Sequence, residues 1–575
     1  MMHHGDHLNN YYKRFKDLFQ KSRDILNKYK LTLISLIILI TFISLITYYR
    51  IKIQMNIGPI WDTYDFLSNA LLFAGQGTGY SDLTRPPFIS FLTSIFFRLG
   101  YLSSTSIFIV DGMLFIFGVV GFFLLLKLRF NNVESLLGSI LYATFPIVIS
   151  FAGAGLSDIP SVSFSIWAIY FTILAVKKNS KFFYFSFPLI MLAFLTRYPS
   201  ALLIFPVIFY ILINQKSVQK IRDIVIGIGI SLLLLIPVLI FFYDIFGSPF
   251  YSFLNFFGSS SSAVSAGTYA YNPDTLYFLN HLPSFIGASG ITIMVIVLSL
   301  TAYELFKFKK SISKIRLFNM KYVKKVTALK LILFTILTLI FIGTFGKLPY
   351  MASEVIFFIL FYIFYTLLKD IHIKCIDMHL LFFAWFMAFF IFHSVYVVKD
   401  GRYFVTMAPA AAYFLLLGLS CTSNKIEFKT KNINLMSLFS VILIFIVLFC
   451  TVSYLPAIQE GNSNLTIRNE NMALASNWLI NYDPAYKDKI IYSELWPYSG
   501  WYLKTSVKMM PIIMNDQMYY TGIDSSNFSP HDSIASNNFL VSNDAYYCFS
   551  IQQGLNLTSY KPLKQFGNII IYKRV

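Results

Sequence analysis

Long runs of uncharged, apolar residues recur from Leu31 almost to Tyr454, and they constrain the fold of this chain more than any other feature. A helix needs about 20 apolar residues to cross the roughly 30 Å hydrocarbon core of a bilayer. No water is present there to bond backbone groups, so such segments cross as helices or closed barrels. The composition agrees, because 57% of the residues are hydrophobic and only 13% are charged. We therefore expect a multi-pass membrane protein.

The apolar runs predict about thirteen membrane-spanning helices. The fifth and sixth are short and share one break, Thr196–Pro199, in which a proline interrupts the helical pattern. The expected fold class is mainly α, a polytopic membrane helix bundle with a small C-terminal α/β domain. The expected spans are 31–49, 104–127, 133–153, 160–176, 182–196, 198–213, 224–243, 284–306, 329–346, 350–368, 378–397, 403–420 and 433–455.

The distribution of lysine and arginine predicts the orientation, since positively charged loops are retained on the cytoplasmic side. With the N-terminus inside, 29 of the 46 basic residues lie in cytoplasmic segments and 8 in outer loops, while the other 9 follow residue 456. Thirteen spans then place the C-terminal segment outside. The formal charge of +19 thus mostly reflects membrane topology, and a nucleic-acid partner is not expected.

The segment 456–575 differs sharply from the rest in composition, with polar stretches and short apolar runs of strand length. It predicts a small extracytoplasmic α/β domain. The expected organisation is a basic cytoplasmic segment 1–30, a transmembrane domain 31–455 with a first outer loop 50–103, and the domain 456–575. Within the last, a helix is expected at Glu470–Ile480 and strands at Lys489–Tyr492, Val507–Met514, Phe539–Ser542 and Asn568–Tyr572.

Ionisable residues at the outer ends of the spans are the strongest functional signal. Such groups are costly near a membrane unless they are paired or used, and their common side predicts one outer cavity. Topology alone also places charges at span ends, so a purely structural role is about equally well supported for any single residue. The group comprises Asp62, Asp65, Asp82, Arg85, Asp158, Arg197, Glu354, His393, Lys399, Asp400 and Arg402.

Carboxylates and arginines together on the outer face suit a lipid-phosphate sugar donor. A phosphate with a second pKa of roughly 6 leaves the sugar without a general acid, but it needs cations around it. A carboxylate takes the proton of the incoming hydroxyl. The chain carries no nucleotide-binding signature and no Asp-x-Asp, which disfavours a nucleotide-sugar donor.

Three landmarks carry a family resemblance. The first outer loop holds Asp62, Phe66, Ala70 and Gly77, followed by Arg85-Pro86-Pro87-Phe88; Asp158 lies in GLSDIPSVSF, and Arg402, Tyr403 and Pro409 lie in DGRYFVTMAP. With these landmarks the chain resembles the family 39 glycosyltransferases, which include the dolichyl-phosphate-mannose protein mannosyltransferases and the lipid A aminoarabinose transferase. The resemblance implies a C-type membrane glycosyltransferase fold over residues 31–455.

The resemblance also implies roles for particular residues. Asp62 is the expected general base, with Asp65 as the reserve candidate, and Asp158 is expected to bind acceptor or sugar hydroxyls. If the loop is helical there, Asp62 and Asp65 share a face at i,i+3 spacing, and such a pair can raise the pKa of one of them; the alternative is that one of them is an N-terminal helix cap. Planar arginine donors grip phosphate well, and the expected phosphate-binding residues are Arg85, Arg197, Arg402 and, more weakly, His393.

The function implied is transfer of a sugar, mannose in the protein mannosyltransferases, from a polyprenyl (dolichyl) phosphate to a hydroxyl. The expected reaction is an inverting displacement on the outer face of the cell membrane. Protein, glycolipid and glycan acceptors all stay open, and so does a divalent cation as a cofactor; membrane lipid is an expected partner. The alternatives are a polytopic transporter or lipid flippase, and a non-catalytic membrane scaffold.

Overall fold

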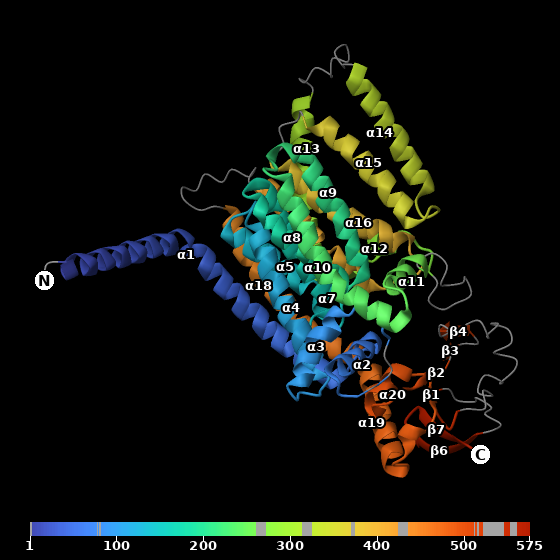
Figure 1. Cartoon of the computed structure of the whole chain (residues 1–575). Helices are drawn as coiled ribbons and strands as arrows, with labels where there is room; N and C mark the ends of the chain where they lie inside the picture. Colours follow the sequence, from blue (N-terminus) through green and yellow to red (C-terminus); the bar gives the residue numbers. More distant parts are fainter. Residues whose placement is uncertain are drawn as a thin grey trace.

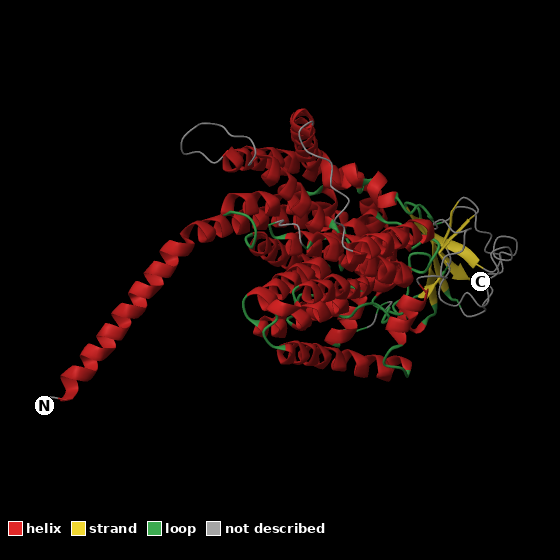
Figure 2. Cartoon of the chain, turned by 90° about the horizontal axis from the view of Figure 1, so that it is seen from above, coloured by secondary structure: helices red, strands yellow, loops and turns green. Residues whose placement is uncertain are grey.

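The protein is a bundle of long helices with a small sheet at one end (Figure 1). This is a computed structural model, and it describes residues 3–77, 79, 82–259, 272–312, 325–369, 374–423, 435–510, 512–514, 517–520, 545–551 and 560–575. Seen from above, the strands lie at the end of the bundle opposite the N-terminal part of the first helix (Figure 2). The expected mainly α fold class is confirmed.

A helix lies at each of the thirteen expected spans. Among the described residues, eight helices are long and apolar enough to cross a membrane, and five further apolar helices are shorter. The exact number of spans therefore stays a prediction. The helices at these positions are α1 His3–Ile57, α4 Thr105–Leu126, α5 Asn132–Thr144 with α6 Pro146–Phe151, α7 Asp158–Lys177, α8 Phe183–Thr196, α9 Ile204–Ile213, α10 Ile221–Phe246, α13 Leu282–Ile312, α14 Lys325–Thr344, α15 Tyr350–Leu368, α16 Ile376–Val395, α17 Ala408–Ser423 and α18 Leu435–Gly461.

The first helix continues past the expected boundary at residue 49 and ends at Ile57. Arg50, the residue after that boundary, is buried inside the bundle. Its Nε donates to the Ile149 carbonyl at 3.0 Å, and its Nη2 donates to Gln54 Oε1 at 2.8 Å. A buried charge with hydrogen-bond partners is tolerated within a helix, so α1 continues beyond the expected span.

The predicted break at Thr196–Pro199 is present. α8 ends at Thr196, Arg197 has an extended backbone, and a 3-10 helix, Tyr198–Leu203, follows. Pro199 has no N–H to donate to the carbonyl four residues earlier, and its ring would collide with that carbonyl. The break leaves Arg197 between the two helices, where its side chain contacts Asp158.

The first outer loop folds into two short helices, α2 Trp61–Ala74 and α3 Phe88–Arg98. Gly58 precedes α2 with a φ of +85°, and α2 ends at Gly75, which has a φ of +70°. Both angles lie in the left-handed region that favours glycine. The two helices pack against each other, and α3 also packs against α4.

The C-terminal segment contains α19 Ser463–Tyr482, α20 Trp496–Leu503 and a five-stranded sheet of order β2-β1-β5-β7-β6. β1 pairs in parallel with β2 and β5, while β7 runs antiparallel to β5 and β6. β3 and β4 form a separate antiparallel pair. The bounds are β1 Ile491–Ser493, β2 Lys508–Met509, β3 Ile512–Met514, β4 Gln517–Tyr520, β5 Tyr547–Ser550, β6 Tyr560–Phe566 and β7 Ile569–Arg574.

The predicted elements of this segment are largely present. α19 contains the expected helix, and strands occupy parts of 489–492, 507–514 and 568–572. The strand expected at Phe539–Ser542 lies outside the described residues. The sequence analysis missed three strands: β4, β5 and β6. The four residues of β5 are all buried and so do not alternate, and β6 contains Pro562 and two lysines.

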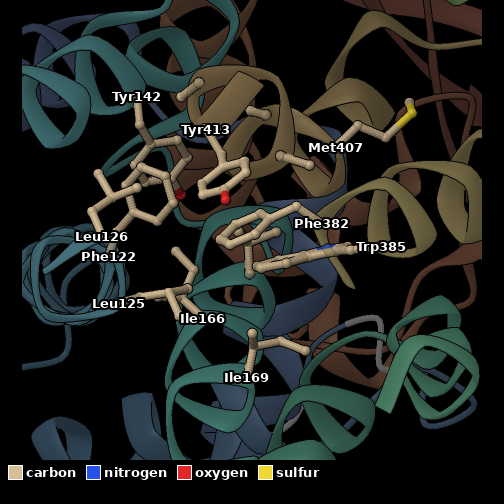
Figure 3. Packing of buried hydrophobic residues seen from close by; sticks show 14 of the residues in the cluster. Phe122, Leu125, Leu126, Tyr142, Ile166, Ile169, Phe382, Trp385, Met407 and Tyr413 are labelled. Atoms are coloured by element: carbon tan, nitrogen blue, oxygen red, sulfur yellow. The ribbon is translucent and has the colours of Figure 1, made fainter. Parts of the chain in front are cut away.

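The two largest of five apolar clusters among the described residues account for most of the core. The larger fills the bundle, where the rings of Phe382 and Tyr413 stack at 3.8 Å beside Trp385 and Tyr142 (Figure 3). The second joins α2, α3 and α4 to α19, α20 and the sheet. The C-terminal segment therefore shares a core with the first outer loop.

Candidate functional site

Arg85 binds three carboxylates in the first outer loop. Asp62 lies in the first turn of α2, and Asp65 follows one turn later on the same face. Arg85 Nη2 lies 3.1 Å from Asp62 Oδ1 and 2.6 Å from Asp65 Oδ2. Its Nε lies 3.3 Å from Asp82 Oδ2. One guanidinium therefore holds the two predicted base candidates in a fixed relation to each other.

Arg402 binds the second oxygen of Asp62. It lies in the 3-10 helix Gly401–Thr406 between α16 and α17. Its Nη1 is 2.6 Å from Asp62 Oδ2, and its Nε is 3.1 Å from Asp400 Oδ2. Asp62 is thus held by two arginines from distant parts of the chain, and 18% of its side chain remains exposed.

Asp158 and Arg197 form a second ion pair, with Arg197 Nη1 2.6 Å from Asp158 Oδ1. Asp158 is the first residue of α7 and is almost wholly buried. The loop before it turns through Gly153 and Gly155, both with positive φ. Asp111 Oδ2 on α4 accepts a 2.9 Å hydrogen bond from the Gly155 backbone, which fixes the loop that leads to Asp158.

Tyr403 connects the two ion pairs. The Arg197 guanidinium lies 5.1 Å from the centre of the Tyr403 ring, and that of Arg402 lies 5.6 Å from it. His393 stacks on the same ring at 4.8 Å. Cations over an aromatic face are attracted to it, and here the ring also spaces two like charges apart. Arg197, Arg402 and His393 therefore converge as predicted.

His393 and Lys399 complete this side of the site. His393 is buried, and neither of its ring nitrogens has a hydrogen-bond partner in the described part of the chain. Lys399 Nζ donates to the carbonyls of His393 at 2.9 Å and Ser394 at 2.8 Å, and also to that of Tyr396. Burial lowers the pKa of Lys399 to about 8.

The two carboxylates of α2 have opposite pKa shifts. Burial alone would raise the pKa of Asp62, but the positive charges of Arg85 and Arg402 outweigh it and lower that pKa below its usual value. Burial raises the pKa of Asp65 to about 8, against the attraction of Arg85. We expected the closeness of Asp62 and Asp65 to raise the pKa of one of them. The pKa of Asp65 does rise, but its main cause is burial.

Of the charged residues named from sequence, Glu354 is the one that makes no hydrogen bond or ion pair with this cluster in the described part of the chain. It is buried on α15, and within the described residues neither of its carboxylate oxygens has a hydrogen-bond partner. The sequence reading gave no role to Asp111 or to the ring of Tyr403, whose positions depend on tertiary packing. Among the described residues, no group of three or more His, Cys, Asp or Glu side chains is arranged to hold a metal ion.

Comparisons with known proteins concern the family and the fold. Residues 84–241 match the model of the dolichyl-phosphate-mannose-protein mannosyltransferase family. A crystal structure of ArnT from Cupriavidus metallidurans bound to undecaprenyl phosphate is similar, with a TM-score of 0.55 and 11% identity over 94% of this chain and 98% of that one. The chain has the C-type membrane glycosyltransferase fold. The resemblance found in the sequence is confirmed.

The apo form of the same ArnT is similar to this chain almost to the same degree, with a TM-score of 0.54 and 11% identity over 94% of this chain and 98% of that one. No curated protein sequence matches the chain. The family-model match includes Arg85, Asp158 and Arg197 but ends before Arg402 and begins after Asp62. The likeness to ArnT extends over nearly the whole of both proteins.

Proposed function

We propose that the protein is a membrane glycosyltransferase that moves a sugar from a polyprenyl phosphate to a hydroxyl acceptor, with Asp62 as the base. The observation that carries this proposal is the Asp62 carboxylate, bound on one oxygen by Arg85 and on the other by Arg402. The family match and the ArnT likeness support glycosyl transfer, and the lipid in the ArnT structure supports a polyprenyl phosphate as the donor carrier.

The donor phosphate would compete with Asp62 for the same arginines. A phosphate ester presents oxygens that match the planar donors of a guanidinium, as a carboxylate does. When Arg85 and Arg402 turn to the phosphate, the charge that lowers the pKa of Asp62 moves away from it. The carboxylate becomes a better base at the moment the donor is bound, because basicity follows pKa.

The reaction is then a single displacement. The acceptor oxygen forms a bond to the anomeric carbon, and the bond from that carbon to the phosphate oxygen breaks. The phosphate leaves with the electron pair, and the arginines stabilise its added charge. Asp62 takes the proton of the acceptor hydroxyl, so no external acid is required. Attack from the face opposite the phosphate inverts the anomeric centre.

Asp158 is assigned to hydroxyl binding in the same cavity. Its contact with Arg197 orients the carboxyl group, whose oxygens can accept hydrogen bonds from sugar or acceptor hydroxyls. His393, buried with both ring nitrogens unpaired in the described part of the chain, is assigned to the donor phosphate. Protein, glycolipid and glycan hydroxyls remain alternative acceptors for the assay below.

The test is transfer of labelled sugar from a panel of polyprenyl-phosphate sugars to acceptor mixtures by purified protein in proteoliposomes. Asp62→Asn should reduce turnover at least a hundredfold, on the order expected for loss of a general base. Arg402→Ala should chiefly raise the donor KM. Asp244→Asn, at an exposed aspartate on α10, is the matched control and should keep wild-type activity. No turnover with any donor, together with lipid flipping or solute uptake, would favour a transporter.

A further inference from the structure

The turn before Asp62 is short and lacks a side-chain cap of its own. Only Gly58, Pro59 and Ile60 separate α1 from α2. Gly58 has a φ of +85°, and the N-cap residue Ile60 offers no side-chain hydrogen bond to α2. Asp62 is the second residue of α2, so the path of this turn determines where its carboxylate points.

Asn469 from the C-terminal segment binds this turn. Its Nδ2 donates to the carbonyls of Ile57 at 2.7 Å and Pro59 at 3.2 Å. Its Oδ1 accepts a 2.9 Å bond from the Tyr64 hydroxyl. The amide therefore bonds both the end of α1 and the first turns of α2. Its side chain also fills the space above Gly58, where a Cβ would overlap it.

Tyr64 fixes the face of α2 that points away from the arginines. Two residues along a helix correspond to a rotation of about 200°, so Tyr64 and Asp62 lie on opposite faces. Tyr64 is fully buried, and its ring lies 4.3 Å from that of Tyr498 on α20. Figure 1 shows α19 and α20 beside α2, at the same end of the bundle.

We propose that Asn469 is a positioning residue for the transfer reaction, and that the C-terminal segment orients Asp62 through it. The inference rests on the proposed function of Asp62. Asn469 is only 5% exposed, and its amide group uses both of its donors and its acceptor at this turn. It touches no catalytic group itself, and it acts through the backbone of residues 57–59 and through Tyr64.

Asn469→Leu tests the proposal because it keeps a side chain of similar size and removes all three hydrogen bonds. We expect kcat to fall roughly tenfold or more, as geometry at the base is lost, while the donor KM changes less than about twofold. Tyr64→Phe removes the bond to Asn469 Oδ1 together with the 3.2 Å bond to the Tyr502 hydroxyl, keeps both bonds from Asn469 to the turn, and should give a smaller loss of the same kind. Asn477→Leu, at an exposed position of α19, is the matched control with wild-type kinetics.

Hydrogen exchange separates this inference from the proposed function, because it needs no turnover. Backbone amides of 61–66 should exchange roughly tenfold faster in Asn469→Leu than in Asn477→Leu, while those of α7 stay unchanged. Unchanged exchange in 61–66 would overturn the positioning role whatever the activity. Faster exchange with wild-type kcat would also overturn it. If the wild type transfers no sugar at all, the proposed function fails, and with it the catalytic part of the inference.

Discussion

Asp62, Asp65 and Asp82 surround a single guanidinium, so the cluster around Arg85 holds more negative charge than positive. One carboxyl group in such a cluster is best kept protonated. Burial selects Asp65, whose side chain is 2% exposed, and raises its pKa to about 8. Asp62 is more exposed and has a second arginine, so it stays ionised. The two aspartates therefore suit different roles, and Asp62 is the better candidate for the base.

The first prediction concerns Asp65→Asn, which imitates the neutral carboxyl group. Activity near pH 6 should stay within a few fold of wild type, in contrast to Asp62→Asn. In the folded wild type Asp65 keeps its proton up to about pH 8, whereas in the unfolded chain it loses the proton above its ordinary pKa of 3.8. The free energy of unfolding therefore falls as the pH rises from about 4 to about 8. In Asp65→Asn the thermal unfolding midpoint, measured across that pH range, should not show this fall. A loss of activity equal to that of Asp62→Asn would make Asp65 the base.

A second prediction concerns divalent cations. Arg85, Arg197 and Arg402 supply positive charge where the donor phosphate would bind, and two of them already occupy the oxygens of Asp62. Prolonged treatment with EDTA should therefore leave transfer unchanged, as measured by the proteoliposome assay. Loss of activity that Mg²⁺ or Mn²⁺ restores would instead make Asp62 and Asp158 metal ligands.

Sequence reasoning located the charged residues but not their partners. Their common side of the membrane followed from the order of spans and the distribution of lysine and arginine, and ten of the eleven named residues do meet. The pairs themselves, such as Asp62 with Arg402 across 340 positions, depend on how the helices pack. The same holds for the stack of His393 on Tyr403, which no spacing in the sequence indicates.

At the scale of elements, apolar runs predicted helix positions well, because the membrane requires them. Boundaries were less certain where a polar residue finds buried partners, as Arg50 does inside α1. Short strands were harder, since β5 carries no alternation that would distinguish it from a buried helix segment. The break at Thr196–Pro199 was predicted correctly, and it lies where Arg197 pairs with Asp158.

The third prediction concerns the loop between α6 and α7. Asp111→Ala leaves the buried Gly155 N–H without its acceptor, which costs about 1–3 kcal/mol of stability. Since Asp158 begins α7 directly after this loop, transfer activity should fall about tenfold as well. The comparison is Asp223→Ala, whose carboxylate binds Ser180 and Tyr184 near the predicted cytoplasmic side. That variant should lose stability but keep its activity in the membrane, and equal activity losses in both would contradict the prediction.

At the scale of the whole molecule, the expected transmembrane domain 31–455 and the expected C-terminal domain 456–575 share part of their apolar core. One apolar cluster runs from Tyr64 and Phe97 in the first outer loop to Trp501 and Ile571 in the C-terminal segment. The segment is thus packed on the loop through a common core. The expected side of the membrane for each part stays a prediction, because helix positions alone do not fix orientation.

Cysteine labelling tests that orientation. The native Cys548 is buried and is therefore a poor reporter, whereas Cys421 is exposed near the end of α17. A membrane-impermeant maleimide added to intact cells should label an Asn477→Cys variant and should label Cys421 only after the membrane is permeabilised. Labelling of Cys421 in intact cells would reverse the predicted topology and place Asp62 on the cytoplasmic side.

The contact between Asn469 and Ile57 also sets an order of events during synthesis. Its two residues are 412 positions apart, and at about 5–20 residues per second the ribosome needs roughly 20–80 s to make that length. During this interval α1 and α2 have been made, but the Asn469 side chain that bonds the turn between them has not. By the proposed role of Asn469, a nascent or prematurely terminated chain that lacks this residue turns over lipid donor more slowly than the full chain. Synthesis of the C-terminal segment would itself raise the rate of transfer.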